Sequence, residues 1–384
     1  MDMMALERQL IGFDTTSRNS NLEMVAFLER ILKGAGLRVE IVTSEDGKKA
    51  DIFASLGPSD VGGLMLAGHM DVVPVEGQAW DTDPFKLHEA GDKLYGRGTA
   101  DMKSFLVQSI QAVEALRGRR LNLPVHLAFT YDEEAGCGGA DHLMKSLKAA
   151  GHVMPKCAVI GEPTGFQVFS LHKGFSVVRA TVTGVEGHSG KPELGLNATY
   201  PAAQIIQKLV EVEAERKQHR SMEQHFQFPY TTLNVGTLHG GTAVNIIANR
   251  CEVVFEYRTM PNEDPMYVFR QVDGYVSEVL RPQVKKRDAR ADIRLELVTR
   301  LPPMQVPAGA EIERIALELT QHKTSSAAPY YTEGAIYNEA GIPTVICGPG
   351  DIDQAHRPNE YITREQMEKG PPFLARLIER VCLS

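Results

Sequence analysis

The feature that most constrains the fold is an alternation of short β-rich runs with helical patterns along the first half of the chain. Apolar runs of strand length occur at 37–42, 51–56, 63–67, 125–130 and 157–160. Apolar residues at helical spacing occur at 4–35, 102–116 and 139–149. This alternation predicts an α/β sheet with helices on both faces. Charged and polar residues that end the strands of such a sheet tend to line a crevice.

The pattern changes near Phe175. A strand, a helix, two strands, a helix and a strand then follow at 175–185, 199–216, 232–238, 250–258, 265–279 and 292–298. This βαββαβ order is typical of the split ferredoxin-like unit. The α/β pattern returns after Leu301-Pro302-Pro303, with a helix, a strand and a helix at 311–320, 343–347 and 363–382. We therefore predict a first domain split into 1–174 and 300–384, with a second domain, 175–299, inserted into it.

Charge and composition exclude several classes of protein. The 384 residues include 41 Lys and Arg against 49 Asp and Glu, a formal net charge of −8, which argues against binding to nucleic acid or to an anionic membrane. No apolar stretch approaches the roughly 20 residues that span a bilayer, and the first ten residues lack the apolar core of a signal peptide. The five cysteines form no C-x-x-C pair. These features predict a cytoplasmic protein with reduced thiols.

Five segments rich in histidine and carboxylates could carry chemistry. They are GHMDVVP at 68–74, GRGTADMK at 96–103, YDEEAGCGG at 131–139, IGEPT at 160–164 and GPGDIDQAHRP at 348–358. Each alone has an ordinary explanation: His69 as a surface or core histidine, Asp101 as a helix N-cap, and the Glu133-Glu134 pair as an acidic helix start. Together they supply two histidines and three carboxylates from separate elements. Such nitrogen and oxygen ligands suit a pair of divalent ions, and the imidazoles favour zinc.

Local spacing refines this interpretation. In an extended segment His69 and Asp71 point to the same side, so Asp71 can bond one imidazole nitrogen while the other meets a metal. Neighbouring Glu133 and Glu134 can divide metal binding from proton transfer. Cys137 is interpreted as a small buried residue rather than a nucleophile. The chain contains no HExxH, GxSxG, GxxxxGK or GxGxxG motif, so the commonest protease, esterase and nucleotide-binding sites find no support.

A sixth segment, GVEGHSGKPELGLNA at 184–198, lies between the fourth and the fifth. These six segments, in their order along the chain, resemble the M20 family of di-zinc aminoacylases, deacetylases and carboxypeptidases. The resemblance implies a zinc-exopeptidase-like catalytic sheet and an inserted domain that serves as lid and dimerisation domain. It also implies two Zn²⁺ ions, with Co²⁺ or Mn²⁺ as substitutes. The implied ligands are His69 and Glu162 for one zinc, Glu134 and His356 for the other, and Asp101 as the bridge.

The resemblance also assigns roles to the remaining residues. Glu133 would be the general base that takes a proton from the attacking water and passes it to the departing amine, and Asp71 would orient His69. His188 would reach the active site of the neighbouring subunit in a homodimer and donate to the oxyanion; from sequence alone it is equally well a turn histidine. Asn245 and Arg258 would contact the substrate carboxylate, although Arg258 could also form a surface ion pair. A loop containing Thr332, Glu333 and Gly334 would shape the pocket.

Within the family, three segments resemble the members that convert N2-acetyl-L-ornithine to L-ornithine and acetate in arginine biosynthesis. They are HGGTAVNII at 239–247, FEYRTMP at 255–261 and the whole of 329–358. Acidic Asp132, Asp351 and Asp353 would favour a substrate with a cationic side chain, or simply face solvent. Open alternatives with the same mechanism are N-succinyl-diaminopimelate, another N-acylamino acid or a dipeptide. A non-catalytic, ligand-sensing relative is a different class, and Glu133 argues against it because a binder needs no base.

Overall fold

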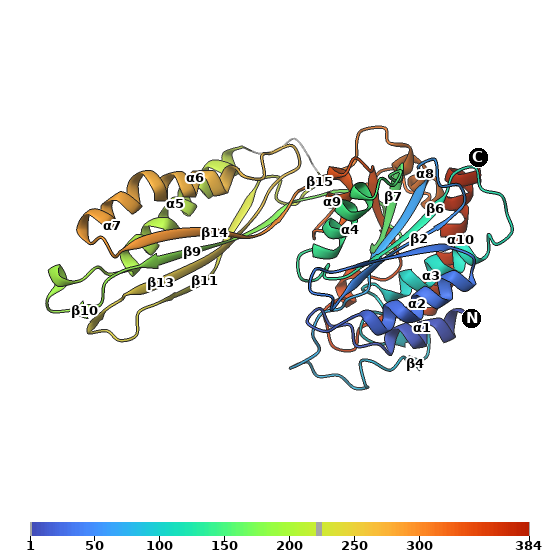
Figure 1. The fold of residues 1–384 in the computed structure, drawn as a ribbon, viewed down its shortest axis with the longest axis horizontal. Helices are drawn as coiled ribbons and strands as arrows, with labels where there is room; N and C mark the ends of the chain where they lie inside the picture. The colour runs from blue at the N-terminus through green and yellow to red at the C-terminus, as the bar shows by residue number, and fades with distance from the viewer. Residues whose placement is uncertain (1, 220–224, 384) are drawn as a thin grey trace. The chain divides into compact units, whose positions relative to one another are not determined.

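The computed structural model describes residues 2–219 and 225–383, which form two compact units (Figure 1). The first, here the sheet unit, comprises Met1–Leu171, Gln305–Ala328 and Thr332–Ser384. The second, here the ferredoxin-like unit, comprises His172–Met304 and Pro329–Tyr331. The division into these units does not test the domain limits 174/175 and 299/300, which stay a prediction. Within the described ranges no helix is long and apolar enough to cross a membrane.

The sheet unit is built on a mixed sheet whose centre is parallel. In spatial order its strands are β1 (Arg38–Thr43), β2 (Ala50–Leu56), β6 (Val125–Thr130), β3 (Leu64–His69), β7 (Cys157–Pro163), β17 (Thr344–Gly348), β8 (Phe169–His172) and β15 (Met304–Gln305), and β16 (Ser326–Ala328) pairs with β8. Strands β6, β3, β7 and β17 run parallel to one another. Their carboxyl ends therefore meet at one edge, where α/β proteins place ligands.

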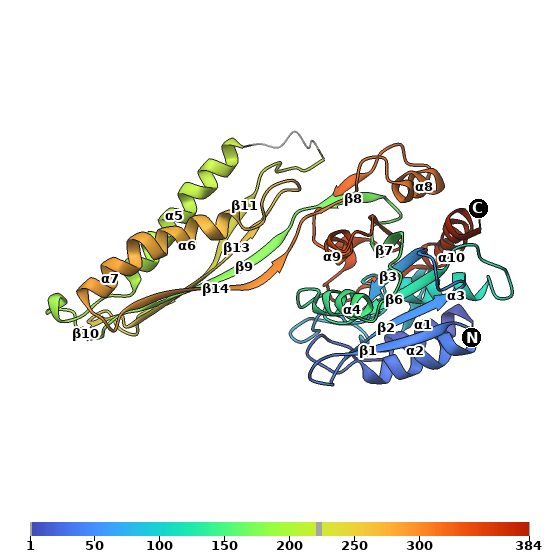
Figure 2. The ribbon, with the colours of Figure 1, turned by 45° about the horizontal axis from the view of Figure 1, so that its top comes forward.

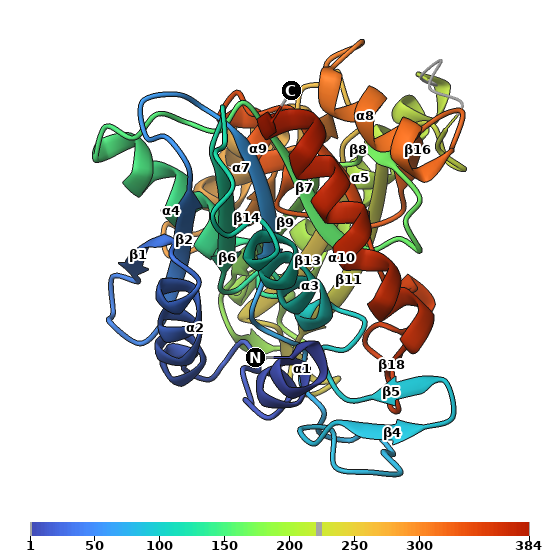
Figure 3. The ribbon, with the colours of Figure 1, turned by 90° about the vertical axis from the view of Figure 1, so that its right-hand side faces the viewer.

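Helices cover both faces of this sheet, which confirms the predicted α/β architecture (Figures 2 and 3). One face carries α1 (Met3–Ile11), α2 (Leu22–Gly34), α3 (Lys103–Glu114) and α10 (Arg364–Ile378), and the other carries α4 (Gly138–Ala149) and α9 (Gly334–Glu339). Helix α8 (Glu311–Thr320) has the predicted bounds. A small separate sheet joins β4 (His88–Ala90), β5 (Lys93–Tyr95) and β18 (Tyr361–Thr363).

The helical region predicted at 4–35 is in fact two helices, and the interruption has a local cause. The Asp14 carboxylate accepts hydrogen bonds from the Thr16 amide (3.1 Å) and hydroxyl (2.6 Å), a turn that competes with helix. Thr15 Oγ1 then donates to the carbonyl of Met70 (2.6 Å), and Thr16 forms a bridge with Val72. The backbone is therefore not helical here, and it pairs with the segment that follows β3.

The ferredoxin-like unit has the predicted βαββαβ order. Its elements are β9 (Phe175–Thr183), α5 (Thr199–Gln218), β11 (Thr232–Gly240), β13 (Arg250–Arg258), α6 (Tyr267–Tyr275), the π-helical turn Val276–Leu280, α7 (Arg281–Arg287) and β14 (Asp292–Leu301). The antiparallel sheet has the order β11-β13-β9-β14. Alternate residues of β9 and β13 are buried, as expected when one face packs against helices. Two short strands, β10 (Gly187–His188) and β12 (Ile246–Ile247), pair separately.

Candidate metal centre

The two histidines and three carboxylates singled out from the sequence lie together in the sheet unit. His69 is the last residue of β3, and Glu162 is the second-last residue of β7. Gly161 precedes Glu162 for a packing reason, because a Cβ at this position would lie 1.9 Å from the Phe105 ring of α3. Asp101 lies two residues before α3, Glu134 follows β6, and His356 lies in the loop after β17. The carboxyl ends of parallel strands thus gather these side chains.

The five residues form two groups of three that share Asp101. In one group, His69 Nε2 lies 3.0 Å from Asp101 Oδ1 and 3.8 Å from Glu162 Oε1. In the other, His356 Nε2 lies 3.3 Å from Asp101 Oδ2 and 3.0 Å from Glu134 Oε1. Within each group the candidate ligand atoms lie within 4.8 Å of one another. We name His69, Asp101 and Glu162 the buried triad and Asp101, Glu134 and His356 the open triad.

The charges of this cluster perturb each other strongly. Burial raises the pKa of Glu162, and the neighbouring charge of Asp101 adds to this effect. Burial would also raise the pKa of Asp101, but hydrogen bonds with His356 and His69 outweigh it and lower that pKa. Hydrogen bonds with Asp101 and Glu134 raise the pKa of His356 to about 10. The pKa values of Glu134 and Glu162 are therefore raised mainly by burial, and those of His69 and His356 are raised by the neighbouring carboxylates.

The donor set fits two divalent cations. With neutral imidazoles, Asp101, Glu134 and Glu162 would place three negative charges in a largely buried cluster, and an uncompensated cluster of this kind is very costly. Divalent cations would balance that charge. Imidazole nitrogens and carboxylate oxygens are ligands that zinc accepts, and the two separate oxygens of Asp101 face the two triads as a bridging carboxylate requires.

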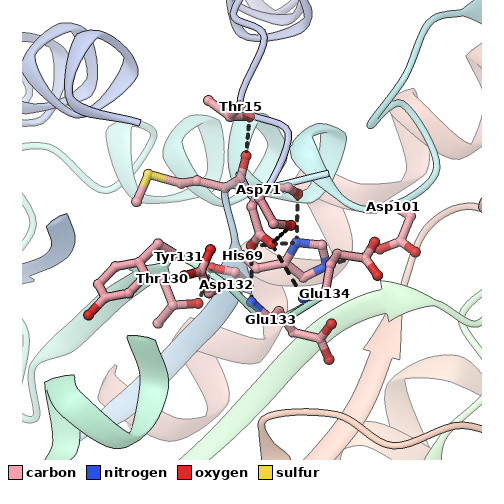
Figure 4. A network of polar contacts seen from close by, with 12 residues as sticks. Thr15, His69, Asp71, Asp101, Thr130, Tyr131, Asp132, Glu133 and Glu134 are labelled. Atoms are coloured by element: carbon pink, nitrogen blue, oxygen red, sulfur yellow. Dashed lines mark hydrogen bonds and ion pairs between the residues drawn. The ribbon is translucent and has the colours of Figure 1, made fainter. Parts of the chain in front are cut away.

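Asp71 contacts more than the sequence predicted. Strand β3 ends at His69, so the period of two does not extend to Asp71, and His69 Nδ1 lies 2.9 Å from the main-chain carbonyl of Asp71 and 3.6 Å from its carboxylate. The carboxylate instead accepts from the amides of Glu133 (3.1 Å) and Glu134 (3.3 Å) (Figure 4). Ser17 Oγ donates to Asp71 Oδ2 (2.6 Å), the oxygen that also accepts from the Glu134 amide. Asp71 therefore joins the His69 segment to the backbone of the Glu133-Glu134 pair.

Glu133 is buried beside the triads. Burial raises the pKa of its carboxyl group well above the usual range, and the charge of Glu162 adds to the effect. The buried thiol of Cys137 lies 3.6 Å from Glu133 Oε1, which confirms Cys137 as a small buried residue. All five cysteines are free thiols.

The ordinary explanations for two of the segments are wrong in their local geometry. Met102, not Asp101, occupies the N-cap position of α3, and the Asp101 carboxylate faces the two imidazoles. Helix α4 begins at Gly138, beyond the Glu133-Glu134 pair, so that pair is not a helix start. Sequence patterns did not single out Thr15 or Ser17, which reach this region from the loop after α1. No local motif marks them, since Ser17 lies 54 positions from Asp71.

The loop predicted to shape the pocket is buried at the start of α9. The Glu333 carboxylate accepts hydrogen bonds from Thr130 Oγ1 at the end of β6 and from the Tyr337 hydroxyl (2.9 Å). Thr332 Oγ1 accepts from the Gly334 amide (3.1 Å). Burial raises the pKa of Glu333 to about 7. Contact of these residues with a substrate stays a prediction.

The other predicted residues lie in the ferredoxin-like unit. His188 and Asn245 are neighbours there: His188 pairs with Ile246, and the Ser189 amide donates to the carbonyl of Asn245 (3.1 Å). His188 is exposed, and its Nδ1 accepts from the Gly190 amide (3.0 Å), as in a turn histidine. Arg258 lies at the far end of β13, with its guanidinium over the Phe175 ring at 5.1 Å.

The acidic residues predicted to select a cationic substrate differ in whether their charge is already paired within the chain. Asp132 forms an ion pair with Lys49, so its charge is already balanced within the chain. Asp351 caps the 3₁₀ turn Ile352–Gln354 by accepting from the Asp353 amide (2.9 Å). Selection of a cationic substrate by these side chains stays a prediction, and Asp132 is the weakest candidate for it.

An α/β sheet that carries two nitrogen and oxygen triads around one shared carboxylate is typical of hydrolases that use two metal ions. A family model described as "Peptidase family M20/M25/M40" matches residues 65–380. The acetylornithine deacetylase of Pasteurella multocida is 33% identical over 366 residues, which cover 94% of this chain and 92% of that relative. The acetylornithine deacetylase of Photorhabdus laumondii is 33% identical over 386 aligned positions, which cover 99% and 97%. The chain therefore belongs to peptidase family M20/M25/M40, whose members are metal-dependent hydrolases that act on amide bonds.

Solved structures share the fold at lower sequence identity. An M20 family metallo-carboxypeptidase from Sulfolobus solfataricus has a TM-score of 0.77 at 18% identity, covering 99% of both chains. The aminopeptidase PepT of Bacillus cereus has a TM-score of 0.75 at 20% identity, covering 98% of this chain and 97% of the other. A Bacillus subtilis protein described as a dinuclear metal-binding peptidase of the M20 family has a TM-score of 0.67 at 16% identity, covering 98% and 96%. These similarities confirm the predicted fold class.

Proposed function

We propose that the chain hydrolyses the amide bond of an N-acylated amino acid, and that its substrate is N2-acetyl-L-ornithine, which yields L-ornithine and acetate. The observation that carries the proposal is the pair of triads around Asp101 with buried Glu133 beside them. Relatives that carry the name acetylornithine deacetylase align over nearly the whole chain and support this substrate. A role in arginine biosynthesis and a cytoplasmic location stay predictions.

His69 and Glu162 would hold one cation, Glu134 and His356 the other, and Asp101 both. When bound, the two cations, which we propose to be Zn²⁺, would polarise the amide carbonyl and make a water molecule more acidic. Glu133 would accept the proton of that water and deliver it to the nitrogen of the departing amine. Its raised pKa suits this exchange, because a carboxylate that binds a proton more tightly than usual is a better proton acceptor.

Asp71 would fix the backbone of the base, Glu133, and of the adjacent ligand, Glu134. Its carboxylate holds the amides of Glu133 and Glu134, and its carbonyl fixes Nδ1 of His69. A hydrogen bond on Nδ1 leaves Nε2 of His69 free to bind a cation, since it sets the tautomer of the ring. The same residue would thus orient a ligand of the buried triad, a ligand of the open triad and the base.

We propose that the enzyme is a homodimer formed through the ferredoxin-like unit. His188 and Asn245 adjoin the start of β13 through β10 and β12, whereas Arg258 ends that strand. Eight steps of about 3.3 Å separate Arg250 from Arg258, or roughly 26 Å. One copy of the chain therefore cannot bring His188, Asn245 and Arg258 to the same small substrate. In the proposed dimer, the second copy supplies His188 and Asn245. The outer edge of β11, with exposed Leu238, offers a surface for such pairing.

A panel of purified substrates tests the assignment. Zinc-loaded protein would be assayed with N2-acetyl-L-ornithine, N-succinyl-diaminopimelate, other N-acylamino acids and dipeptides, and the values of kcat/KM compared. We expect acetylornithine to give the highest value. A higher value for another acylamino acid would retain the mechanism and overturn the substrate, and no hydrolysis of any member would overturn the proposed function.

A further inference from the structure

A network of three side chains lies behind the shared carboxylate and the open triad. Gln78, Arg97 and Glu360 come from three separate segments of the sheet unit and are not members of either triad. We name these three residues the support network. It connects the backbone that carries Asp101 to the backbone that carries His356.

Glu360 fixes the backbone at Asp101. The Glu360 side chain is fully buried, and its Oε1 accepts from the amides of Gly98 (3.0 Å), Ala100 (2.8 Å) and Asp101 (3.1 Å). Its Oε2 accepts from Arg97 Nη1 (2.5 Å). Three amides of one turn therefore converge on a single carboxylate oxygen, and hydrogen bonds to an ionised acceptor are the strong ones. The position of the shared carboxylate depends on this contact.

Arg97 links Glu360 to Gln78 through hydrogen bonds to both side chains. Its guanidinium is buried, donates from Nη2 to Gln78 Oε1 (2.6 Å) and lies over the Trp80 ring at 5.1 Å. Trp80 Nε1 also donates to Gln78 Oε1 (3.0 Å). Two donors on the oxygen fix the orientation of the Gln78 amide, and its nitrogen then donates to the carbonyl of His356 (2.8 Å).

His356 needs an external support of this kind. Its φ of +62° lies in the left-handed region, which is unfavourable for a residue with a side chain. Its imidazole is 53% exposed, so packing does little to fix it. His69 differs, since it ends strand β3 and is held by the carbonyl of Asp71. The contact from Gln78 therefore acts on the histidine that has the least support of its own.

We propose that Gln78, Arg97 and Glu360 are positioning residues that hold His356 in register with Asp101 and so set the affinity of the open triad for its cation. This inference rests on the proposed two-cation centre. It predicts an asymmetry. Among the five proposed ligands, Gln78 hydrogen-bonds directly to His356 alone, so its loss should weaken the binding of one cation. Glu360 holds the carboxylate that the triads share, so its loss weakens both.

The test titrates metal-free full-length protein with Zn²⁺ alone, in competition with a chromophoric chelator, so that the two affinities are read without any assay of activity. The variants are Gln78→Met, Gln78→Glu and Glu360→Gln. Gln78→Met keeps the length of the side chain without its hydrogen bonds. Gln78→Glu keeps an oxygen for Arg97 and Trp80 and removes only the donor to His356. Gln9→Met, at an exposed position of α1, is the matched control.

We expect the parent and Gln9→Met to bind two Zn²⁺. Both Gln78 variants should keep one affinity within about threefold and weaken the other by about 10–100-fold, as for other residues that orient metal ligands. The added charge of Gln78→Glu would by itself strengthen cation binding, so a loss in that variant reflects lost orientation. Glu360→Gln should weaken both affinities.

The folded state of each variant is checked by its thermal unfolding midpoint. Parental affinities in both Gln78 variants, or an equal loss at both sites, would overturn the positioning role. A parent that binds fewer than two Zn²⁺ would overturn the two-cation centre itself, and the positioning role with it. The two failures are thus distinguishable.

Discussion

The buried and open triads share one carboxylate and have the same kinds of ligand, yet the chain supports them differently. The His69 side chain is 1% exposed and ends a central strand, whereas His356 is 53% exposed and lies in a loop with a left-handed backbone. Sheet geometry positions one histidine, and we propose that a hydrogen bond from the Gln78 side chain to its carbonyl positions the other. Similar ligand chemistry with unequal support leads us to expect one tightly held cation and one that exchanges more readily.

The largest expected effect is on kcat, and it distinguishes the proton transfer assigned to Glu133 from metal binding by the two triads. Glu133→Ala should lower kcat by about 10²–10⁴-fold, because it removes the proposed base, while two Zn²⁺ still bind. Turnover of acetylornithine and metal content would both be measured, with exposed Glu45→Ala as the control. A kcat within a few-fold of the parent would show that another group moves the proton.

The next prediction compares the histidines directly. His69→Ala and His356→Ala should each weaken one Zn²⁺ by more than about 100-fold, since removal of a ligand costs more than removal of a supporting contact. In the parent, stepwise addition of chelator should remove the cation of the open triad first. Metal content after dialysis measures this order, and exposed His322→Ala is the control. Release of both cations in a single step would contradict the expected difference in affinity between the two triads.

The third prediction concerns stability and a buried carboxyl group that belongs to neither triad, that of Glu7. Glu7 is fully buried, accepts from Ser104 Oγ (2.7 Å), and burial raises its pKa from 4.5 to about 7. Between these values the folded chain holds a proton that the unfolded chain has lost, so the free energy of unfolding falls as pH rises through this window. The effect is on the order of 3 kcal/mol.

Glu7→Gln removes this titration. Its advantage over the parent in urea midpoint should therefore be larger at pH 8 than at pH 5. Glu23→Gln, on an exposed face of α2, is the matched control. An advantage that is equal at the two pH values would contradict the assignment of the titration to Glu7.

The smallest effect tests whether the centre also needs a second copy of the chain. His188→Ala and Glu133→Ala subunits would be mixed in equal amounts and allowed to exchange. If His188 acts on the neighbouring subunit, half of the dimers are mixed and each has one intact site, so activity should recover to about one quarter of the parent. No recovery, once subunit exchange is demonstrated by mass spectrometry, would place His188 outside the neighbouring site.

The sequence predicted most of the fold because periodicity records burial directly. Strands β6 and β13 and helix α8 have the predicted bounds, and their alternation with other elements defined the architecture. The short strands β8, β15 and β16 escaped prediction, since two to four residues are too few to show a period. The helical region expected at 4–35 is interrupted, because Asp14 bonds the Thr16 amide in a turn and Thr16 forms a bridge with distant Val72.

The candidate centre was predictable in its residue types and not in its supports. Histidines and carboxylates at strand ends identified the set of five candidate ligands, because only a few chemistries need that set, and the family resemblance divided them between two ions. Glu360 and Gln78 resemble ordinary loop residues in sequence, and their partners lie far along the chain: Gln78 meets His356 at a separation of 278 positions. Such contacts follow from tertiary structure, so no local pattern marks them.

Anomalous diffraction at the zinc edge from crystals of the zinc-loaded protein tests the central claim most directly. The account predicts two peaks about 3.5–4 Å apart, one contacted by His69 and Glu162 and the other by Glu134 and His356, with an oxygen of Asp101 at each. A single peak, or peaks away from these five side chains, would contradict it.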